Sequence, residues 1–357
     1  MREFTIAALP GDGIGPEVIA AGLEVLQALT QKVGLFQLHV EKFPWGSNYY
    51  KTHGEMMPRN GLELLRPFSA IYFGAVGAPD VSDHITLWGL RLAICQGFDQ
   101  YVNLRPTRIL RGLSSPLHDC KPGDLDWAIV RENTEGEYAG HGGRAHRGLP
   151  EELATETSIF TRRGVTRIMR FAFKLAQDRP RKLLTVVTKS NAQRHGMVLW
   201  DEIAEEVARE FPDVRWDKML VDAMTTRMVG KPSSLDTIVA TNLHADILSD
   251  LAAALAGSLG IAPTANLDPE RRFPSMFEPI HGAAFDITGK GIANPVGAFW
   301  TAALMLEHLG ESDAARLLMQ AIERVTESGL HTPDLGGTAT TREVTSAVCD
   351  AIHSANA

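Results

Sequence analysis

The sequence predicts an α/β protein with two domains and a largely parallel sheet. Short β-branched and apolar runs alternate with helical patterns along almost the whole chain, which is typical of α/β layers. At 357 residues the chain is long enough for two domains and a substantial core. No internal repeat, low-complexity tract or flexible linker is present, so we expect the domain boundary where the chain crosses between layers.

The first predicted strand, residues 4–9, enters a glycine-rich turn at residues 10–17. Pro16 fits the first turn of a helix that should reach about Val33. The glycine spacing is G-x-G-x-G-P rather than G-x-G-x-x-G, and no acidic residue closes a βαβ unit about 20 residues on. The turn is therefore a weak Rossmann signal, but it is suited to bringing backbone close to a ligand.

The remaining elements follow in the same alternation. Further strands are predicted at residues 70–73, 126–130, 182–188, 219–221 and 235–240. Helices are predicted at residues 87–95, 162–177, 196–210, 298–308, 312–328 and 341–353, and another directly after residue 240. The glycine-rich stretch 139–150 lacks periodicity and predicts a loop or an extended arm near residues 139–160.

Composition limits the possible partners and compartment. Hydrophobic residues make up 44% and charged residues 22%, as in ordinary globular proteins, while the net charge of −8 argues against nucleic acid or an anionic membrane as main partner. The three cysteines, Cys95, Cys120 and Cys349, are far apart and lack metal-ligand spacing. With no signal-peptide pattern and no apolar stretch of membrane-spanning length, these features predict a cytoplasmic protein.

Asp246 and Asp250 form the clearest candidate metal site. They follow the strand at residues 235–240 and are four residues apart, so on a helix they project from the same side. A divalent cation such as Mg²⁺ or Mn²⁺ would turn their repulsion into binding energy. The alternative is a pair of solvated aspartates near a helix start, where the helix dipole tolerates negative charge.

Other charged residues lie at strand ends, where open α/β sheets bind ligands. Arg105 and Arg131 offer planar groups that match carboxylates, so together they are suited to a dicarboxylate. Lys189 follows one strand and is suited to act as a base if desolvation lowers its pKa. Asp222 follows another strand, and Tyr138 lies at a turn, where it is suited to donate a proton. Each of these residues, taken singly, is also compatible with an ordinary polar role at the end of an element.

Residues 277–295 form a third candidate cluster. The segment is rich in glycine and small residues but polar at intervals, as a loop around a nucleotide would be. Asp286 is suited to accept hydrogen bonds from ribose hydroxyls, which would favour NAD over the additional phosphate of NADP. An ordinary glycine-rich surface loop is the alternative.

Eight motifs together resemble the isocitrate and isopropylmalate dehydrogenase family of β-decarboxylating dehydrogenases. They are LPGDGIGPEV at 9–18, NLRP at 103–106, VRENTEGEY at 130–138, TKSNA at 188–192, VDAM at 221–224, NLHADILSDL at 242–251, EPIHGAAFD at 278–286 and GKGIANP at 289–295. GDGIGP by itself is only suggestive, whereas the ordered set covers nearly the whole chain. Within the family, the sequence looks most similar to the members that act on tartrate and D-malate.

The resemblance implies a fold of two α/β domains, not a Rossmann fold, with the active site in the cleft between them. One domain, residues 1–101 plus 258–357, would bind the cofactor, and the other, residues 102–257, would bind substrate and form the dimer. The resemblance implies an oxidoreductase that oxidises and decarboxylates a 2-hydroxy dicarboxylate, with NAD, Mn²⁺ or Mg²⁺, and K⁺ as cofactors. For D-malate the products would be pyruvate and CO₂.

The resemblance also implies a role for each matched residue. Asp246 and Asp250, with Asp222 from the other subunit of a homodimer, would bind the metal ion. Lys189, also from the other subunit, would be the general base, with Tyr138 as the acid and Arg105 and Arg131 as ligands of the substrate carboxylates. The NAD contacts would be His281, Gly282, Asp286 and Asn294.

The sequence departs from the family at one position. Most members have a further substrate arginine about ten residues before the NLRP arginine, but here Cys95 occupies that position and the nearest upstream arginine is Arg91. About one helical turn separates the two positions, so we assign Arg91 to the substrate site. The same region lacks the Ser/Asn pair expected for isocitrate, whereas Trp88 and Leu90 are suited to line an isopropyl pocket.

Two alternatives therefore stay open. Isopropylmalate dehydrogenase is the nearer one, and it differs from the first hypothesis in substrate only. A non-catalytic regulatory subunit is the distant one, and it predicts loss of a metal aspartate, Lys189 or Tyr138. All of those residues are present, so it ranks last.

Overall fold

The computed structural model describes residues 1–355, which form two structural units. Among the described residues, unit 1 comprises residues 1–100, 106–123 and 253–355, and unit 2 comprises residues 101–105 and 124–252. Residues 106–123, which the sequence analysis assigned to the second domain, thus group with unit 1. Two contacts explain this grouping, because Ser115 donates to the carbonyl of Leu255 over 2.6 Å and Arg108 pairs with Glu323 over 2.9 Å.

The strands of unit 1 run mainly parallel. β1 (Arg2–Gly11) pairs in parallel with both β2 (Phe36–Lys42) and β3 (Ala70–Ala75), and β3 pairs in parallel with β12 (Ser275–Pro279). β11 (Pro263–Leu267) is antiparallel to β12. β4 (Val102–Arg108) contributes residues to both units.

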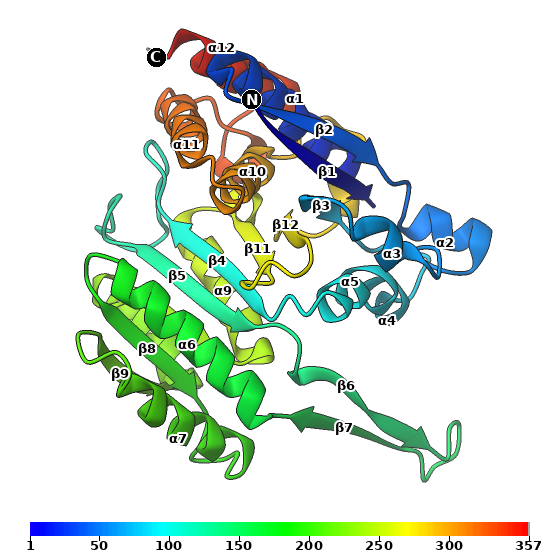
Figure 1. Cartoon of the computed structure of the whole chain (residues 1–357), viewed down its shortest axis with the longest axis vertical. Helices are drawn as coiled ribbons and strands as arrows, with labels where there is room; N and C mark the ends of the chain where they lie inside the picture. Colours follow the sequence, from blue (N-terminus) through cyan, green and yellow to red (C-terminus); the bar gives the residue numbers. More distant parts are fainter. Residues whose placement is uncertain (356–357) are drawn as a thin grey trace. The chain divides into compact units, whose positions relative to one another are not determined.

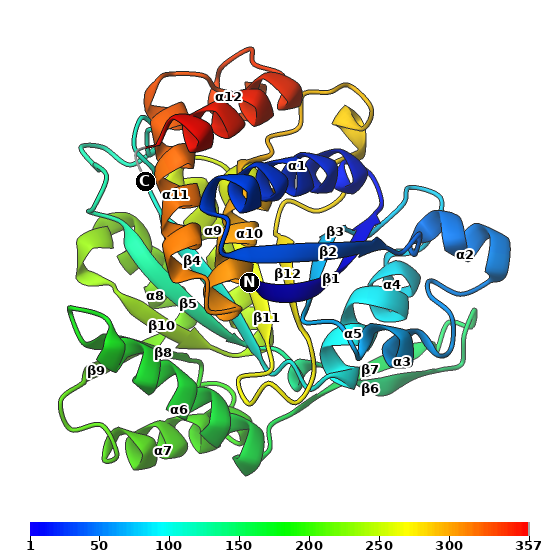
Figure 2. The ribbon, with the colours of Figure 1, turned by 45° about the horizontal axis from the view of Figure 1, so that its top comes forward.

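Four long helices cover one side of the unit 1 strands (Figure 2). α1 (Gly15–Val33) packs on β1 and β3, and α10 (Val296–His308) packs on β11 and β12. α11 (Ser312–Glu327) and α12 (Thr341–Ser354) pack on these two helices and on each other. Because α10 contacts sheet and helices at once, it is buried along most of its length.

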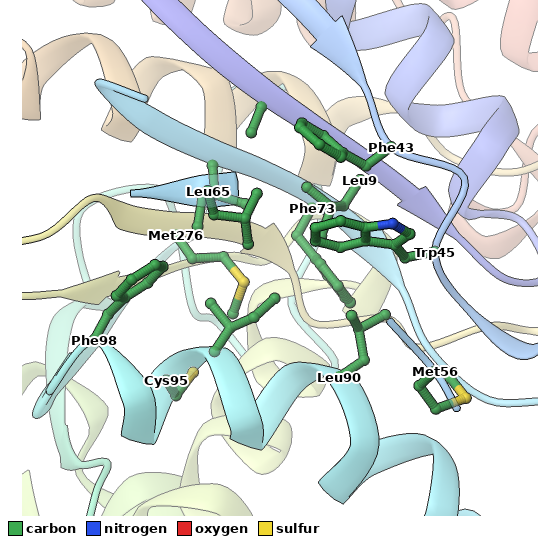
Figure 3. Packing of buried hydrophobic residues seen from close by; sticks show 13 residues of the cluster. Leu9, Phe43, Trp45, Met56, Leu65, Phe73, Leu90, Cys95, Phe98 and Met276 are labelled. Atoms are coloured by element: carbon green, nitrogen blue, oxygen red, sulfur yellow. The ribbon is translucent and has the colours of Figure 1, made fainter. Parts of the chain in front are cut away.

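The opposite side of these strands holds a hydrophobic cluster (Figure 3). The short helices α2 (Ser47–His53), α3 (Gly61–Leu65), α4 (Asp83–Thr86) and α5 (Leu92–Gly97) belong to this part of unit 1. Cys95 is fully buried in the cluster, together with Leu90, Phe98 and Met276. The single helix predicted over residues 87–95 is instead interrupted by a π-helical turn, Leu87–Arg91. Gly89 in that turn lets Met56 approach closely, because a Cβ there would lie 2.6 Å from the Met56 Cγ.

The strands of unit 2 form a parallel arrangement in which β10 (Thr237–Ala240) is central. β10 pairs with β5 (Asp126–Glu132) on one side and with β8 (Leu183–Thr188) on the other, and β8 pairs with β9 (Arg215–Leu220). The carboxyl ends of all four strands therefore meet at one edge. This is the edge at which open α/β sheets bind ligands.

The helices of unit 2 follow its strands. α6 (Arg162–Asp178) packs across β5, β8 and β10, and α7 (Gly196–Ala208) packs on α6 and β8 (Figure 1). α8 (Val221–Gly230) packs on β8 and β9 (Figure 2). α9 (Asn242–Ala256) begins directly after β10.

The glycine-rich stretch forms an antiparallel hairpin in unit 2. β6 (Gly136–Ala145) pairs with β7 (Leu153–Ile159), and the register shifts between Gly136 and His141. Most of the hairpin is exposed, and it extends away from the other elements of unit 2 (Figure 1). Of the two predicted possibilities, a loop or an extended arm, the structure has an extended arm, which is built as a two-stranded sheet.

The predicted α/β fold class is confirmed, and the long helices end within a few residues of their predicted limits. β2, β4, β11 and β12 were not identified from the sequence. The described residues also contain five short 3₁₀ or π turns: Leu87–Arg91, Pro232–Ser234, Leu259–Ile261, Phe285–Ile287 and Pro333–Leu335. Within residues 1–355, no helix combines the length and the apolar character needed to cross a membrane.

Candidate active site

The first candidate cluster forms where β5 and β10 end in unit 2. Arg131 at the end of β5 is in register with Ala240, the last residue of β10. α9 begins two residues after Ala240, so its first turns lie next to the Arg131 side chain. Parallel pairing therefore brings together two sequence motifs that are about a hundred residues apart.

Asp246 on α9 is the shared partner of this cluster. Arg131 donates to Asp246 Oδ1, and its Nε and Nη2 donate to Asn242 Oδ1 over 3.0 and 2.6 Å. The Tyr138 hydroxyl donates to Asp246 Oδ2 over 3.1 Å. The Arg131 guanidinium also lies 5.3 Å from the centre of the Tyr138 ring.

Arg105 joins the cluster from β4. Its Nη1 lies 3.3 Å from Asp246 Oδ1 and 3.8 Å from Asp250 Oδ1, and it donates to Ser249 Oγ over 2.6 Å. The two arginine side chains are only 7% and 3% exposed, whereas those of Asp246 and Asp250 are 35% and 57% exposed. The arginines of the cluster are therefore buried, whereas its carboxylates are accessible to solvent.

The carboxylate pair matches the predicted metal site in its chemistry. Burial raises the pKa of Asp250 above its ordinary value, Arg105 opposes the shift, and the neighbouring Asp246 carboxylate adds to it. A divalent cation would relieve this repulsion, and carboxylate oxygens are the ligands that Mg²⁺ and Mn²⁺ prefer. Within residues 1–355 of one chain, no three His, Cys, Asp or Glu side chains come together in a group that could hold a metal ion. Here the candidate metal site therefore consists of the two carboxylates of Asp246 and Asp250.

Lys189 and Asp222 form a separate ion pair in unit 2. Thr188 and Leu220 are in register at the ends of β8 and β9, so the residues that follow them are neighbours. Lys189 Nζ lies 2.5 Å from Asp222 Oδ1, and this contact lowers the pKa of the Asp222 carboxyl. Asp222 is 66% exposed and Lys189 is 27% exposed, so the pair remains accessible.

Three glutamates of the VRENTEGEY motif have structural roles that the sequence analysis did not identify. Glu132 accepts from the backbone N–H groups of Thr134 and Glu135 and from the Thr134 hydroxyl, over about 3 Å. Glu135 accepts from the Thr161 backbone and hydroxyl at the start of α6. Glu137 accepts from the Thr241 hydroxyl and the Leu243 backbone at the start of α9. The sequence signal for these contacts is the presence of three glutamates within six residues, directly after a strand.

Unit 1 contains a cavity of about 400 Å³ that is lined by three of the four predicted cofactor residues, His281, Asp286 and Asn294. Gly282, the fourth, follows His281 with a positive φ of 66° and is exposed. Asn294 donates to Asp334 over 3.0 Å and accepts from the Val296 backbone over 3.0 Å, which fixes its orientation.

His281 presents a hydrogen-bonding atom that is not used within unit 1. Its Nδ1 lies 2.8 Å from the Gly282 carbonyl oxygen, so Nδ1 carries the proton and Nε2 is an acceptor. Within residues 1–355, Nε2 is buried and has no hydrogen-bond partner. Burial lowers the pKa of His281, which keeps the ring neutral at physiological pH. Nε2 of the neutral ring is therefore the atom of His281 that is able to accept a further hydrogen bond.

The glycine-rich turn after β1 packs against Ala283, in the loop that follows His281. Gly13 has a φ of +59°, and a Cβ there would lie 1.9 Å from the Ala283 carbonyl oxygen. The Ile14 N–H donates to the same oxygen over 2.9 Å. Asp12 holds the turn by accepting from Ser47 and from the Gly77 N–H over 2.9 Å or less. The turn thus lies close to residue 283, and the predicted approach of its backbone to a ligand stays a prediction.

Arg91 lies in unit 1, where it pairs with Glu278 on β12. Its Nε and Nη2 both lie 2.7 Å from Glu278 Oε1, and Nη2 also donates to Asn266 on β11 over 3.4 Å. The two side chains are 11% and 7% exposed, so this is a buried ion pair. Cys95, at the position where the family resemblance leads one to expect arginine, packs in the hydrophobic cluster instead (Figure 3).

Comparisons with known proteins agree over almost the full length. The family model described as isocitrate/isopropylmalate dehydrogenase matches residues 5–352. The chain is 77% identical to a probable tartrate dehydrogenase/decarboxylase of Agrobacterium vitis, with 100% of this chain and 98% of that protein covered. It is 52% identical to the D-malate dehydrogenase [decarboxylating] of Escherichia coli (strain K12), covering 99% of each chain. A crystal structure of isocitrate dehydrogenase from Methylococcus capsulatus superimposes with a TM-score of 0.87 at 34% identity, covering 99% of this chain and 100% of that one.

Burial of Glu132 makes a testable contribution to stability. Burial raises the pKa of Glu132 from 4.5 to about 7, so the folded protein retains a proton that the unfolded chain releases between these values. The stabilisation from the protonated form is fully present below about pH 4.5 and is lost as the pH rises through about 7. In the wild type, the free energy of unfolding should therefore fall by on the order of 3 kcal/mol as the pH rises through this range. We predict that Glu132→Gln removes this pH dependence, because glutamine does not titrate.

Urea unfolding at about pH 5 and about pH 8 measures the difference. The glutamine amide cannot accept from both backbone N–H groups, so the variant should lose a constant amount of stability at both pH values. The diagnostic quantity is therefore the difference between the two pH values. An equal difference in wild type and variant would contradict the assignment.

Proposed function

The chain belongs to the isocitrate/isopropylmalate dehydrogenase family, and on that premise we propose that it is an NAD-dependent, divalent-metal-dependent dehydrogenase of D-malate and tartrate. The observation that carries the proposal is the convergence of Arg105, Arg131 and Tyr138 on Asp246. This arrangement offers two cations for substrate carboxylates and one hydroxyl for proton transfer. Relatives named tartrate dehydrogenase/decarboxylase and D-malate dehydrogenase support the choice of substrate.

In this proposal Arg105 and Arg131 bind the carboxylates of the substrate. A guanidinium group matches a carboxylate with two parallel hydrogen bonds, and two such groups fit a dicarboxylate. A divalent cation would compensate the charges of Asp246 and Asp250, leaving both guanidinium groups available to the substrate. Arg91 differs, because it pairs with the buried Glu278 on β12. We propose that this ion pair orients Arg91, and its role as a substrate ligand stays a prediction.

We propose that Mn²⁺ or Mg²⁺ is held by Asp246 and Asp250 together with Asp222 from the other subunit of a homodimer. When bound, the cation would lower the pKa of the substrate hydroxyl and stabilise negative charge on its oxygen. The ligand types fit, and the raised pKa of Asp250 fits a site built for a cation. The exposure of Asp222 leaves it accessible to a second copy of the chain.

The chain's own residues would move the protons of the reaction. Lys189, also from the other subunit, would take the proton of the C2 hydroxyl, and NAD⁺, when bound, would supply the acceptor for the C2 hydride. The product is a 2-oxo acid with a carboxylate β to the new carbonyl group. That carboxylate leaves as CO₂, its bonding electrons form an enolate, and Tyr138 gives the enolate carbon a proton. For D-malate the sum is pyruvate, CO₂ and NADH.

With tartrates the reaction has a second course after oxidation. The second hydroxyl group lets the oxidised product enolise, so turnover can stop before CO₂ is lost. The proposal therefore allows both oxidation and oxidative decarboxylation by one set of residues.

We propose that NAD binds in the unit 1 cavity. His281 Nε2 would accept a hydrogen bond from the adenine amino group, and the exposed Asp286 would accept from the ribose hydroxyls. Gly282 would provide backbone approach without a side chain, and the fixed Asn294 would line the opposite wall. Gly13 packs closely on residue 283 and so helps to hold the loop that contains Gly282 in place.

The proposal also includes a homodimer, K⁺ as an activating ion and a cytoplasmic location. A homodimer with an isologous interface provides both copies of Lys189 and Asp222 to the opposite subunits. K⁺ follows from the family resemblance. The cysteines of the described chain are free thiols, which suits a reducing compartment.

One structural observation weighs against isopropylmalate as the substrate. Leu90, one of the two residues suited to an isopropyl pocket, is fully buried in the hydrophobic cluster and has no surface for a ligand (Figure 3). Trp88 is 38% exposed, but Leu90 does not join it in lining a pocket. The regulatory-subunit alternative stays last, because the proposed metal and proton-transfer residues are all present.

A substrate panel tests the proposal. We expect NADH formation from D-malate, L-tartrate or meso-tartrate in the presence of Mn²⁺ and K⁺, and none of comparable rate from isocitrate or 3-isopropylmalate. Asp246→Asn should abolish the activity, because it removes a charge that both arginines and the metal require. Activity confined to 3-isopropylmalate would reject the substrate assignment, and no activity on any substrate despite NAD binding would favour the regulatory alternative.

Cofactor choice gives an independent test in unit 1. Asp286→Ala should lower the ratio of kcat/KM for NAD to that for NADP at least tenfold, about 1.4 kcal/mol, because the carboxylate favours ribose hydroxyls and repels a 2′-phosphate. Asp313→Ala on α11, whose side chain is 92% exposed, is the control and should leave the ratio unchanged. An unchanged ratio in Asp286→Ala would remove this residue from the cofactor site.

A further inference from the structure

β6 is attached to α9 at two adjacent positions. Glu137 accepts from the Thr241 hydroxyl over 2.9 Å and from the Leu243 N–H over 3.1 Å, at the start of the helix. Tyr138, the next residue, reaches Asp246 one turn further along, over 3.1 Å. Consecutive residues of the strand thus bind consecutive turns of the helix.

The two attachments differ in strength and in chemistry. A carboxylate that accepts from a helix N-terminus forms a charge-assisted bond, and the helix dipole favours its negative charge. Tyr138 reaches α9 through its hydroxyl group, and the proposed reaction requires that hydroxyl to give up its proton. The Glu137 attachment is therefore the one able to hold β6 in place throughout turnover.

The local backbone makes such an anchor necessary. Gly136 precedes the pair with a φ of +75°, and the β6–β7 register shifts between Gly136 and His141. Regular pairing with β7 therefore does not position residues 137 and 138. Their position therefore depends on side-chain contacts, those of Glu137 and Tyr138 with α9 and that of the Tyr138 ring with Arg131.

We propose that Glu137 is a positioning residue for proton donation by Tyr138: by fixing β6 to the first turn of α9 it sets the Tyr138 hydroxyl at Asp246. The inference rests on the proposed function, in which Tyr138 is the acid. Glu137 itself touches neither substrate nor cofactor in this account. It acts through the placement of its neighbour.

Glu135 provides a matched control within the same loop. It lies two residues before Glu137, and its carboxylate likewise accepts from a threonine hydroxyl and a backbone N–H, over 2.8 and 3.0 Å. Its partner Thr161 precedes α6, however, and not α9. Glu135→Gln and Glu137→Gln are thus the same chemical change at two helix starts, only one of which bears the candidate site.

The experiment is a double-mutant cycle in the full-length chain. Wild type, Glu137→Gln, Tyr138→Phe and the double variant are compared by steady-state kinetics with D-malate, Mn²⁺ and NAD, with Glu135→Gln alongside. We expect Glu137→Gln to lower kcat about tenfold, about 1.4 kcal/mol, with KM for D-malate changed less than about twofold. In the Tyr138→Phe background the same substitution should have no further effect on kcat.

Thermal unfolding of each variant separates positioning from stability. Glu135→Gln should lose as much thermal stability as Glu137→Gln and keep wild-type kcat. Additive effects of Glu137→Gln and Tyr138→Phe, an equal loss of kcat in Glu135→Gln, or wild-type kcat in Glu137→Gln or Tyr138→Phe would each overturn the inference. A wild-type protein inactive on every hydroxy acid would show instead that the proposed function has failed, and the inference with it.

Discussion

The Asp246 carboxylate is the interaction on which the candidate site depends. It receives Arg131 on one oxygen and the Tyr138 hydroxyl on the other, with Arg105 3.3 Å away. These groups come from three strands and one helix, so a single acidic side chain aligns elements far apart in the sequence. Its exposure of 35% leaves the same carboxylate accessible to a cation from solvent. In the proposed function, one residue therefore both aligns these elements and binds the metal ion.

Hydrophobic periodicity predicted the fold class and most long elements because these elements are half buried and carry a strong pattern. The strands β11 and β12 were missed because they are short and buried on both sides, which removes alternation. The hairpin at residues 136–159 was not recognised as a sheet because it is mostly exposed and glycine-rich. The π-helical turn at Leu87–Arg91 was not predicted, because hydrophobic periodicity does not distinguish it from an α-helical turn; Met56 packs closely against Gly89 within it.

The candidate site was predictable to the extent that strand ends converge in a parallel sheet. That rule places Arg131 beside α9 and Lys189 beside Asp222. It does not reveal ion pairing, so the substrate role given to Arg91 did not anticipate Glu278 as its buried partner. The same limit applies to Glu137, whose partners lie more than a hundred residues further along the chain.

Mn²⁺ affinity tests the central claim most directly, because it reports on α9 without requiring substrate or NAD. We predict, from a titration followed by electron paramagnetic resonance, that Asp246→Asn and Asp250→Asn each bind Mn²⁺ at least tenfold more weakly than wild type, a loss of about 1.4 kcal/mol or more. Asp178→Asn, which alters a 60% exposed carboxylate on α6, should bind like wild type. Wild-type affinity in both α9 variants would contradict the account, because the accessible carboxylates of α9 would then not be the metal site.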